Sequence, residues 1–140
     1  MVAAKNVHGW GPNSTQTAVQ ATNTDVPDAP TNVQTAVSTD SLGIVVTWDP
    51  YVDNGLAVTA VQVYIEYHTP GTYAIDTASC DGTSGTNAAT IVSSRTCTIP
   101  MTDLRGAPWN LVLSDYVVAH VLAMNADGWS TASSDSTGGA

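Results

Sequence analysis

The chain has 140 residues, of which 43% are apolar and 11% are charged, and twelve acidic side chains against three basic ones give a formal net charge of −9. This length suits one domain with a real core, while the negative charge excludes nucleic acids and anionic membrane surfaces as partners. No apolar run approaches the roughly 18 residues of a membrane-spanning helix, so membrane insertion is not expected.

Short strands are expected from Val26 onward. Strong helix formers are scarce and β-branched residues are abundant, so we expect an all-β protein with no helix of any length. Alternating apolar residues assign one face of each strand to the core. The expected core positions are Val33 and Val37 in the first strand, Leu42, Ile44, Val46 and Trp48 in the second, and Val61, Val63 and Ile65 in the third.

Further strands are expected along the rest of the chain. The stretches "TYAIDTA" and "RTCTIP" read as short strands, and "YVVAHVLAMN" and "STASSDST" flank a turn at residues 125–128 and so predict a hairpin. Six or seven short strands with such spacing predict a two-sheet antiparallel β-sandwich.

Three stretches occur in a familiar order: "PDAPTNV", then "VTWDPYVDNGLAVTAVQVYIEY", then "LAMNADGWSTAS". Together they resemble a fibronectin type III domain over about Val26 to Thr137. The resemblance implies an immunoglobulin-like sandwich with Trp48 in its core on strand B, and with strands F and G joined at residues 125–128. Order and spacing carry the resemblance rather than any single motif.

Three features depart from the family pattern. The family rarely has a disulfide, whereas this chain has two cysteines. The segment "RGAPWNLVLSD" between Leu104 and Tyr116 is longer than the usual connection of strands E and F. Counting back from Asn125, the place of the family's corner tyrosine falls on Val117 instead of Tyr116. The corner hydrogen bond is then lost unless a bulge restores the register.

The two cysteines, Cys80 and Cys97, bracket a polar loop rich in Gly, Ser and Thr. An even number of cysteines around a flexible loop predicts a disulfide in an extracellular protein. Two buried free thiols are the alternative, since cysteine is also a common small core residue. A zinc site is not expected, because neither cysteine has a second ligand at the required spacing.

The start of the chain repeats part of its end at a constant offset of 119 residues. The matching pairs are Val2 and Val121, Ala4 and Ala123, Asn6 and Asn125, Gly9 and Gly128, Trp10 and Trp129, and Ser14 and Ser133. Matches at one offset are typical of a repeat, with chance as the alternative. We therefore predict that residues 1–20 are the terminal F and G strands of a preceding or neighbouring repeat, residues 21–28 a linker, and residues 29–140 a complete domain.

Two arrangements would complete the leading strands, which cannot be stable alone. The chain is either a window of a tandem array or a subunit that donates strands to its neighbour. The first ten residues, "MVAAKNVHGW", lack the apolar region of a signal peptide, so the protein is either cytosolic or a mature or excerpted piece, and the repeat favours the piece.

The predicted strand F is apolar on both faces. One face carries Val117, Ala119, Val121 and Ala123, and the other carries Val118, His120, Leu122 and Met124. An outer face of this kind needs a cover, supplied either by the segment "WNLVL" or by another copy. The predicted self-association residues are Val2, Ala4, Trp10, Val118, Leu122 and Met124.

Catalytic and cofactor sites are not expected. The single Glu66 lies on a strand, His8, His68 and His120 are far apart, and no serine lies in a nucleophile elbow. The group Asp49, Asp53 and Asn54 favours turn capping over a calcium site. Asn13 begins a sequon for N-glycosylation, which makes glycans a further possible partner.

Two functions compete on this evidence. The first is a structural repeat of an extracellular fibre, filament or surface appendage, joined end to end with copies of itself. The alternative is an adhesion or carbohydrate-binding accessory module of a secreted or cell-surface protein, with Tyr51 and Trp129 as contact aromatics.

Overall fold

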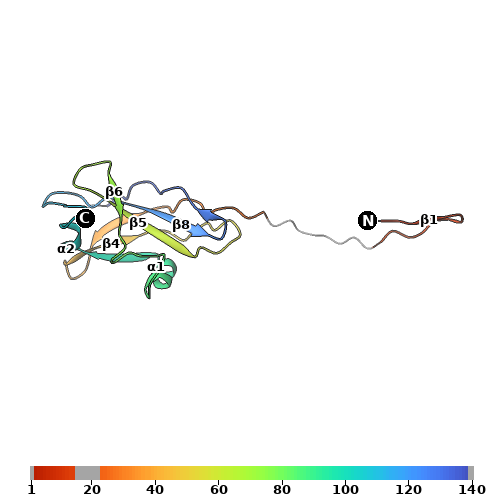
Figure 1. The fold of residues 1–140 in the computed structure, drawn as a ribbon, viewed down its shortest axis with the longest axis horizontal. Coiled ribbons are helices and arrows are strands. Elements are labelled where there is room, and N and C mark those ends of the chain that lie inside the picture. Colours follow the sequence, from red (N-terminus) through yellow and green to blue (C-terminus); the bar gives the residue numbers. More distant parts are fainter. Residues whose placement is uncertain (1, 15–22, 139–140) are drawn as a thin grey trace.

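The computed structural model describes residues 2–14 and 23–138, and the longer of these ranges forms a two-sheet sandwich (Figure 1). The first sheet has the order β3-β4-β7 and the second has the order β6-β5-β8-β9. These strands are β3 (Gln34–Val37), β4 (Gly43–Thr47), β5 (Ala60–Glu66), β6 (Tyr73–Ile75), β7 (Thr96–Pro100), β8 (Ala119–Asn125) and β9 (Gly128–Trp129). Every neighbouring pair in these sheets is antiparallel. The predicted fold class is confirmed.

The alternation of apolar residues builds the core between the sheets. Val61, Val63 and Ile65 on β5 are fully buried, as are Ala119, Val121 and Ala123 on β8. Ile44, Val46 and Trp48 cover them from the other sheet, as the sequence predicts. Leu42 and Val37 do not follow the prediction, because they lie at the end of the β3–β4 hairpin, where their side chains are 71% and 55% exposed.

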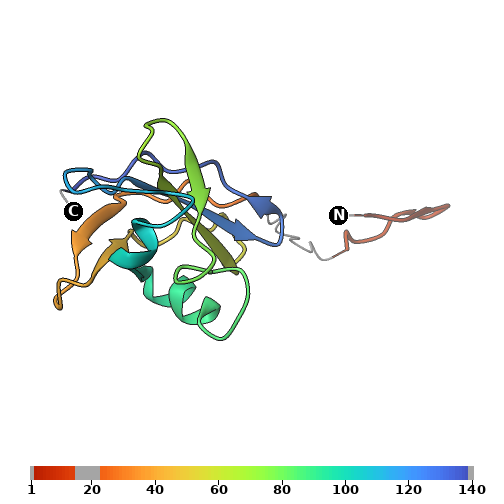
Figure 2. The same cartoon turned by 60° about the vertical axis from the view of Figure 1, so that its left-hand side comes forward.

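Two short helices correct the expectation of a helix-free chain. Helix α1 (Ala88–Ser94) lies inside the loop between the cysteines, and α2 (Met101–Leu104) follows β7 directly. Figure 2 shows α1 at the lower edge of the sandwich. Ile91 of α1 and Leu104 of α2 are buried in the core, so tertiary packing overrides the weak helix propensity of these segments.

The long segment between α2 and β8 packs into the sandwich. Trp109 and Leu111 are buried in the core cluster, and the Trp109 indole donates a hydrogen bond to the carbonyl of Ala74 on β6. Tyr116 is 72% exposed whereas Val117 is buried. No bulge has therefore brought a tyrosine inward at the family's corner position.

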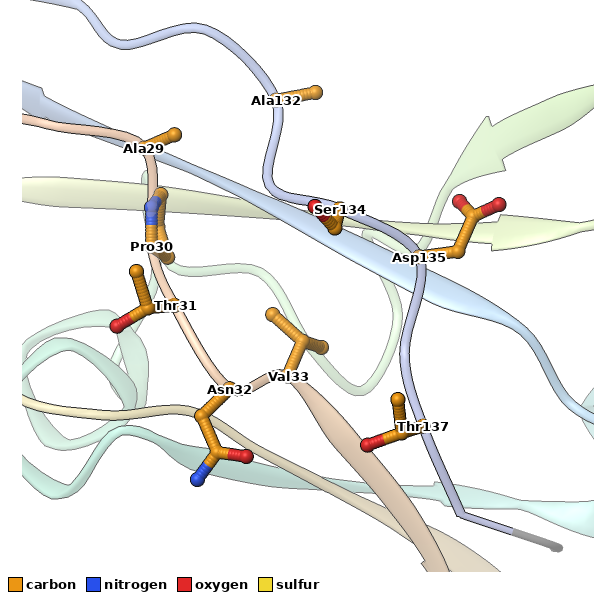
Figure 3. Close-up of a pocket in the computed structure, with 9 residues that line it drawn as sticks. All are labelled: Ala29, Pro30, Thr31, Asn32, Val33, Ala132, Ser134, Asp135 and Thr137. Atoms are coloured by element: carbon orange, nitrogen blue, oxygen red, sulfur yellow. The ribbon is translucent and has the colours of Figure 1, made fainter.

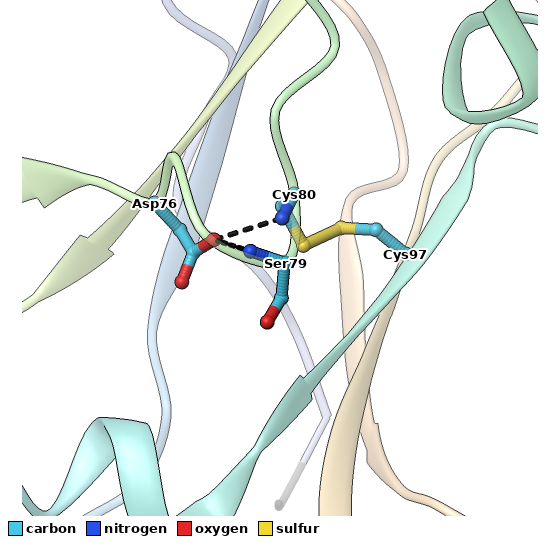
Figure 4. The surroundings of a disulfide bond; sticks show 4 residues. All are labelled: Asp76, Ser79, Cys80 and Cys97. Atoms are coloured by element: carbon cyan, nitrogen blue, oxygen red, sulfur yellow. Dashed lines mark hydrogen bonds between the residues drawn. A yellow bond between two sulfur atoms is a disulfide. The ribbon is translucent and has the colours of Figure 1, made fainter. Parts of the chain in front are cut away.

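Cys80 and Cys97 form a disulfide, as predicted, that joins the loop after β6 to β7 (Figure 4). The buried carboxylate of Asp76 accepts hydrogen bonds from the backbone N–H groups of Ser79 and Cys80 at 2.7 and 2.8 Å. These bonds fix the turn that delivers Cys80 to its partner.

Native protein should contain no thiol that reacts with an alkylating reagent until a reductant is added. Replacing both cysteines with serine should lower the free energy of unfolding by about 3 kcal/mol, because the unfolded chain regains the entropy of a 17-residue loop. Intact-mass measurement and urea unfolding test the two statements. Two alkylated thiols in the untreated protein would contradict the first.

Trp48 should be a centre of stability. Replacing Trp48 with alanine should cost about 3 to 5 kcal/mol, because it empties a buried site and removes the indole donor to the Tyr51 hydroxyl. The matched control is Trp10→Ala, since Trp10 is 69% exposed. Urea unfolding of both variants is the measurement, and similar small losses would contradict the assigned core.

Candidate self-association site

The edge of β8 that faces away from β5 is paired in an unusual way. After β9, the chain continues beside β8 with a serine at every third position: Ser130, Ser133 and Ser136. Their backbone N–H groups donate to the carbonyls of Ala123, Val121 and Ala119 at 2.8, 3.0 and 2.7 Å. Each Oγ accepts the N–H of the same β8 residue, at 2.9 to 3.0 Å. We call this arrangement the serine ladder.

The serine ladder follows from simple geometry. Serine can supply both a backbone donor and a side-chain acceptor, so one residue satisfies both polar groups of its β8 partner. Each step of three residues along the final segment therefore corresponds to a step of two residues along β8, as in a series of bulges. The sequence analysis took "STASSDST" for an ordinary strand. The signal that it missed is the spacing of three between serines.

The N-terminal segment forms a hairpin of its own. Strands β1 (Lys5–Asn6) and β2 (Gly9–Trp10) pair antiparallel in a separate two-stranded sheet. All the hydrogen bonds that the structure gives to residues 2–14 are internal to this hairpin, which Figure 1 draws clear of the sandwich.

The N-terminal hairpin repeats the β8–β9 hairpin in register as well as in sequence. Asn6 faces Gly9 as Asn125 faces Gly128, and Lys5 faces Trp10 as Met124 faces Trp129. Gly9 and Gly128 both have positive φ, at 127° and 139°, a region that favours glycine. The two turns therefore share the same strand register and the same glycine conformation.

The N-terminal hairpin repeats one step of the serine ladder. The N–H of Ser14 donates to the Val2 carbonyl at 2.8 Å, and Ser14 Oγ accepts the Val2 N–H at 3.0 Å. These bonds reproduce those between Ser133 and Val121. Gly11 stands in the place of Ser130 and keeps the backbone bond, to Ala4 at 2.7 Å. Residue 1 and residues 15–20 of the predicted repeat segment, residues 21 and 22 of the predicted linker, and residues 139 and 140 of the predicted domain lie outside the described residues.

The two hairpins differ in their surroundings. Val121 and Ala123 are fully buried, whereas the matching Val2 is 74% exposed and Ala4 is also exposed. Trp10 is 69% exposed, while Trp129 is half-buried. Two strands alone cannot bury an apolar face, so Val2, Ala4 and Trp10 stay exposed on the N-terminal hairpin, and their role in self-association stays a prediction.

Asn125 connects the turn after β8 to two distant segments. Its buried side-chain amide donates to the carbonyls of Asp25 and Asp53 at 2.7 and 3.0 Å. Asn54 holds the segment that leads into β3, residues 25–33, which we call the entry segment. Its amide donates to the Val26 carbonyl and to the Asp28 carboxylate. The residues considered for calcium, Asp53 and Asn54, thus serve the turn and the entry to the sandwich, and Asp49 accepts a hydrogen bond from Asn32.

The outer face of the β6-β5-β8 sheet holds a group of aromatic side chains. His120 lies between Tyr64 and Tyr73, with ring centroids 5.2 and 4.5 Å away. Burial lowers the pKa of His120, so the ring stays neutral to a lower pH than usual. Burial, followed by the hydrogen bond to Asp135, raises the pKa of Tyr73 to about 12.

The other predicted self-association residues lie on this same outer face. Val118, Leu122 and Met124 are half-buried. Of the two covers considered from the sequence, the segment "WNLVL" contributes Trp109 and Leu111 to the core cluster, and Leu111 lines one groove with Val118. A cover by another copy stays a prediction.

The remaining polar groups serve local structure. The carboxylate of Glu66 accepts the N–H of Gly71, and His68 lies 2.7 Å from Asp115. A hydrogen bond from the Val112 N–H, together with one from His68, lowers the pKa of Asp115. The Thr83 hydroxyl and N–H lower the pKa of Asp81 to about 2. Within residues 2–14 and 23–138, no group of three His, Cys, Asp or Glu side chains could hold a metal ion.

A shallow groove of about 320 Å³ lies between the entry segment and the serine ladder (Figure 3). Thr31, Asn32, Asp135 and Thr137 are among the nine residues that line it, and none of the nine is aromatic. Asn13 is exposed on the N-terminal hairpin, and Thr15, the third residue of its sequon, is not among the described residues.

Comparisons with solved structures agree with this geometry. The chain is similar to the crystal structure of domains A168–A170 from titin, at 23% identity and a TM-score of 0.53, over 81% of this chain and 31% of that one. It is also similar to titin kinase and its flanking domains, at 21% identity and a TM-score of 0.52, over 80% of this chain and 16% of that one. Together with the two antiparallel sheets, these likenesses support an immunoglobulin-like or fibronectin-type-III-like β-sandwich fold.

At these identities the likeness shows the fold alone, and the chain spans only about a third and a sixth of the two titin structures. No model of a known protein family matches the sequence, and no curated protein matches it. Within the part of the chain that the structure describes, no helix is long and apolar enough to cross a membrane.

The serine ladder should contribute measurably to stability. Replacing Ser133 with alanine should lower the free energy of unfolding by about 1 to 3 kcal/mol, because the Val121 N–H on a buried strand loses its acceptor. The exposed neighbour supplies the control, since Ser134→Ala should change stability by less than about 0.5 kcal/mol. Equal urea midpoints for the two variants would show that the side-chain half of the ladder contributes nothing.

Proposed function

We propose that the protein is a structural repeat of an extracellular fibre, filament or surface appendage, joined end to end with copies of itself. The observation that carries the proposal is the N-terminal hairpin, which repeats the turn and register of the β8–β9 hairpin and the two hydrogen bonds between Ser133 and Val121. A second F–G hairpin on one chain can bury its apolar side chains only by pairing with a second sandwich.

The course of the chain through the sandwich supports a linear arrangement. The entry segment at Asp25 lies against the β8–β9 turn, through the Asn125 amide. The last ladder residue, Ser136, pairs with Ala119 at the start of β8, so the chain leaves at the opposite end (Figure 1). A module that is entered at one end and left at the other joins its neighbours in a line.

The disulfide and the surface support an extracellular location. A disulfide between Cys80 and Cys97 persists in an oxidising compartment. A net charge of −9 on a surface rich in Thr and Ser keeps an extended assembly soluble. Asn13 is exposed and accessible for glycosylation.

A carbohydrate-binding module is the second candidate, on the strength of the groove beside the serine ladder. Its volume of about 320 Å³ lies at the small end of ligand sites, and its hydroxyl, amide and carboxylate groups could bond a sugar. The contact aromatics expected from the sequence lie elsewhere. The Tyr51 hydroxyl is occupied by Trp48 and by the Val92 carbonyl, and Trp129 pairs with Met124. The repeated hairpin has no purpose in this function.

Electron microscopy of native material separates the two functions. Antibodies raised against residues 23–138 should label fibres or appendages at a regular axial spacing, because each module would add one epitope in line. Label confined to single particles, together with binding of the isolated chain to a polysaccharide, would contradict the structural role. The immunogen keeps the Asp25 carbonyl that Asn125 needs and should remain folded. Preincubation of the antibodies with this immunogen is the control and should abolish the label.

A further inference from the structure

We infer that the N-terminal hairpin supplies the β8-equivalent strand of a second sandwich unit, one built from residues equivalent to 23–119, with Val2 opposite the residue equivalent to Val63 and Ala4 opposite the equivalent of Val61. This inference rests on the proposed end-to-end repeat. It adds the acceptor strand, the register and the contacts that complete the receiving unit.

The unpaired edge of the hairpin specifies the acceptor. On β8, one edge bonds the serine ladder through residues 119, 121 and 123, and the other pairs with β5. In the N-terminal hairpin, Val2 and Ala4 bond the ladder residues Ser14 and Gly11. By the alternation of an antiparallel strand, the N–H groups of Ala3 and Lys5 point to the other edge. Within the described residues that edge has no strand beside it.

The observed pairing of β8 gives the register. Val121 lies opposite Val63, Ala123 opposite Val61, and Met124 opposite Ala60. Subtracting 119 places Val2, Ala4 and Lys5 opposite the same three residues of the receiving copy. The exposed side chains of Val2 and Ala4 then enter the apolar core that holds Val121 and Ala123 in the sandwich.

The hydrogen bonds of Asn6 also agree with this register. Its Oδ1 already accepts the His8 N–H at 2.8 Å, as Asn125 Oδ1 accepts the Asp127 N–H at 2.9 Å. The Asn125 amide spans to the carbonyls of Asp25 and Asp53. In the receiving copy, the Asn6 amide would meet the carbonyls equivalent to these two.

The receiving unit cannot be the sandwich that the same chain builds. Its own β8 occupies the edge of β5 from Ala60 to Ile65, and β6 occupies the other edge of β5 at residues 64–66. The same pairing excludes any copy that keeps its own β8, so the receiving unit is one built from residues equivalent to 23–119, in which the N-terminal hairpin takes the place of β8.

A fusion that keeps the full chain tests the inference. Residues 23–119 are attached directly before Met1, so that Val2 takes the place of Val121 in an upstream sandwich. The matched control fuses residues 23–118 instead, which shifts the new strand by one residue and turns its apolar face outward. Hydrogen exchange of the Ala3 and Lys5 amides is measured by NMR in both fusions and in the unextended chain.

In the aligned fusion, Ala3 and Lys5 should exchange at least about a thousandfold more slowly than in the unextended chain, since they enter a cooperatively folded unit. The shifted fusion should show no such protection. Asn6→Ala should lower the unfolding midpoint of the upstream unit in the aligned fusion and leave the unextended chain unchanged.

Fast exchange of both amides in the aligned fusion, or equal protection in the two fusions, would overturn the inference. Either result would leave the labelling of native fibres as an independent test of the structural role, because fibres can also form through other faces.

Discussion

A strand in the middle of a sheet needs a hydrogen-bonding partner on each edge, and β8 has both. β5 fills one edge with a regular ladder, and the serine ladder fills the other. The core depends on this strand, since Ala119, Val121 and Ala123 are fully buried. The N-terminal hairpin has the turn and the serine edge of β8 but not its β5 edge. Exposed strand edges of this kind promote association between chains.

The alternating pattern predicts the centre of the sandwich well. Val61, Val63 and Ile65 lie deep in a sheet with partners on both sides, so burial follows directly from a period of two. The same pattern fails for Leu42, because the ladder of β4 begins only at Gly43 and Leu42 lies in the turn before it, where its side chain is exposed. The disulfide could be predicted because its cysteines bracket a single flexible loop.

Helix α1 and the serine ladder could not be predicted with the same rules. Thr90, Ile91 and Val92 have weak helix propensity, and their helix is stabilised by the burial of Ile91 against the core. The serine ladder has neither the period of a strand nor that of a helix. The offset of 119 identifies the repeated hairpin from sequence, but only the structure shows that some of its hydrogen bonds are repeated as well.

The disulfide has a mechanical consequence for a module pulled by its two ends. Tension along the line would load the bonds between the serine ladder and β8 together in shear, and also those that join Thr137 to Val33 and Thr35. When these bonds break, the chain lengthens only outside the covalent loop. The 17 Cα–Cα steps from Cys80 to Cys97 would withhold about 60 Å of contour length. The disulfide would then limit the extended length of each module, and this length would increase only when the disulfide is reduced.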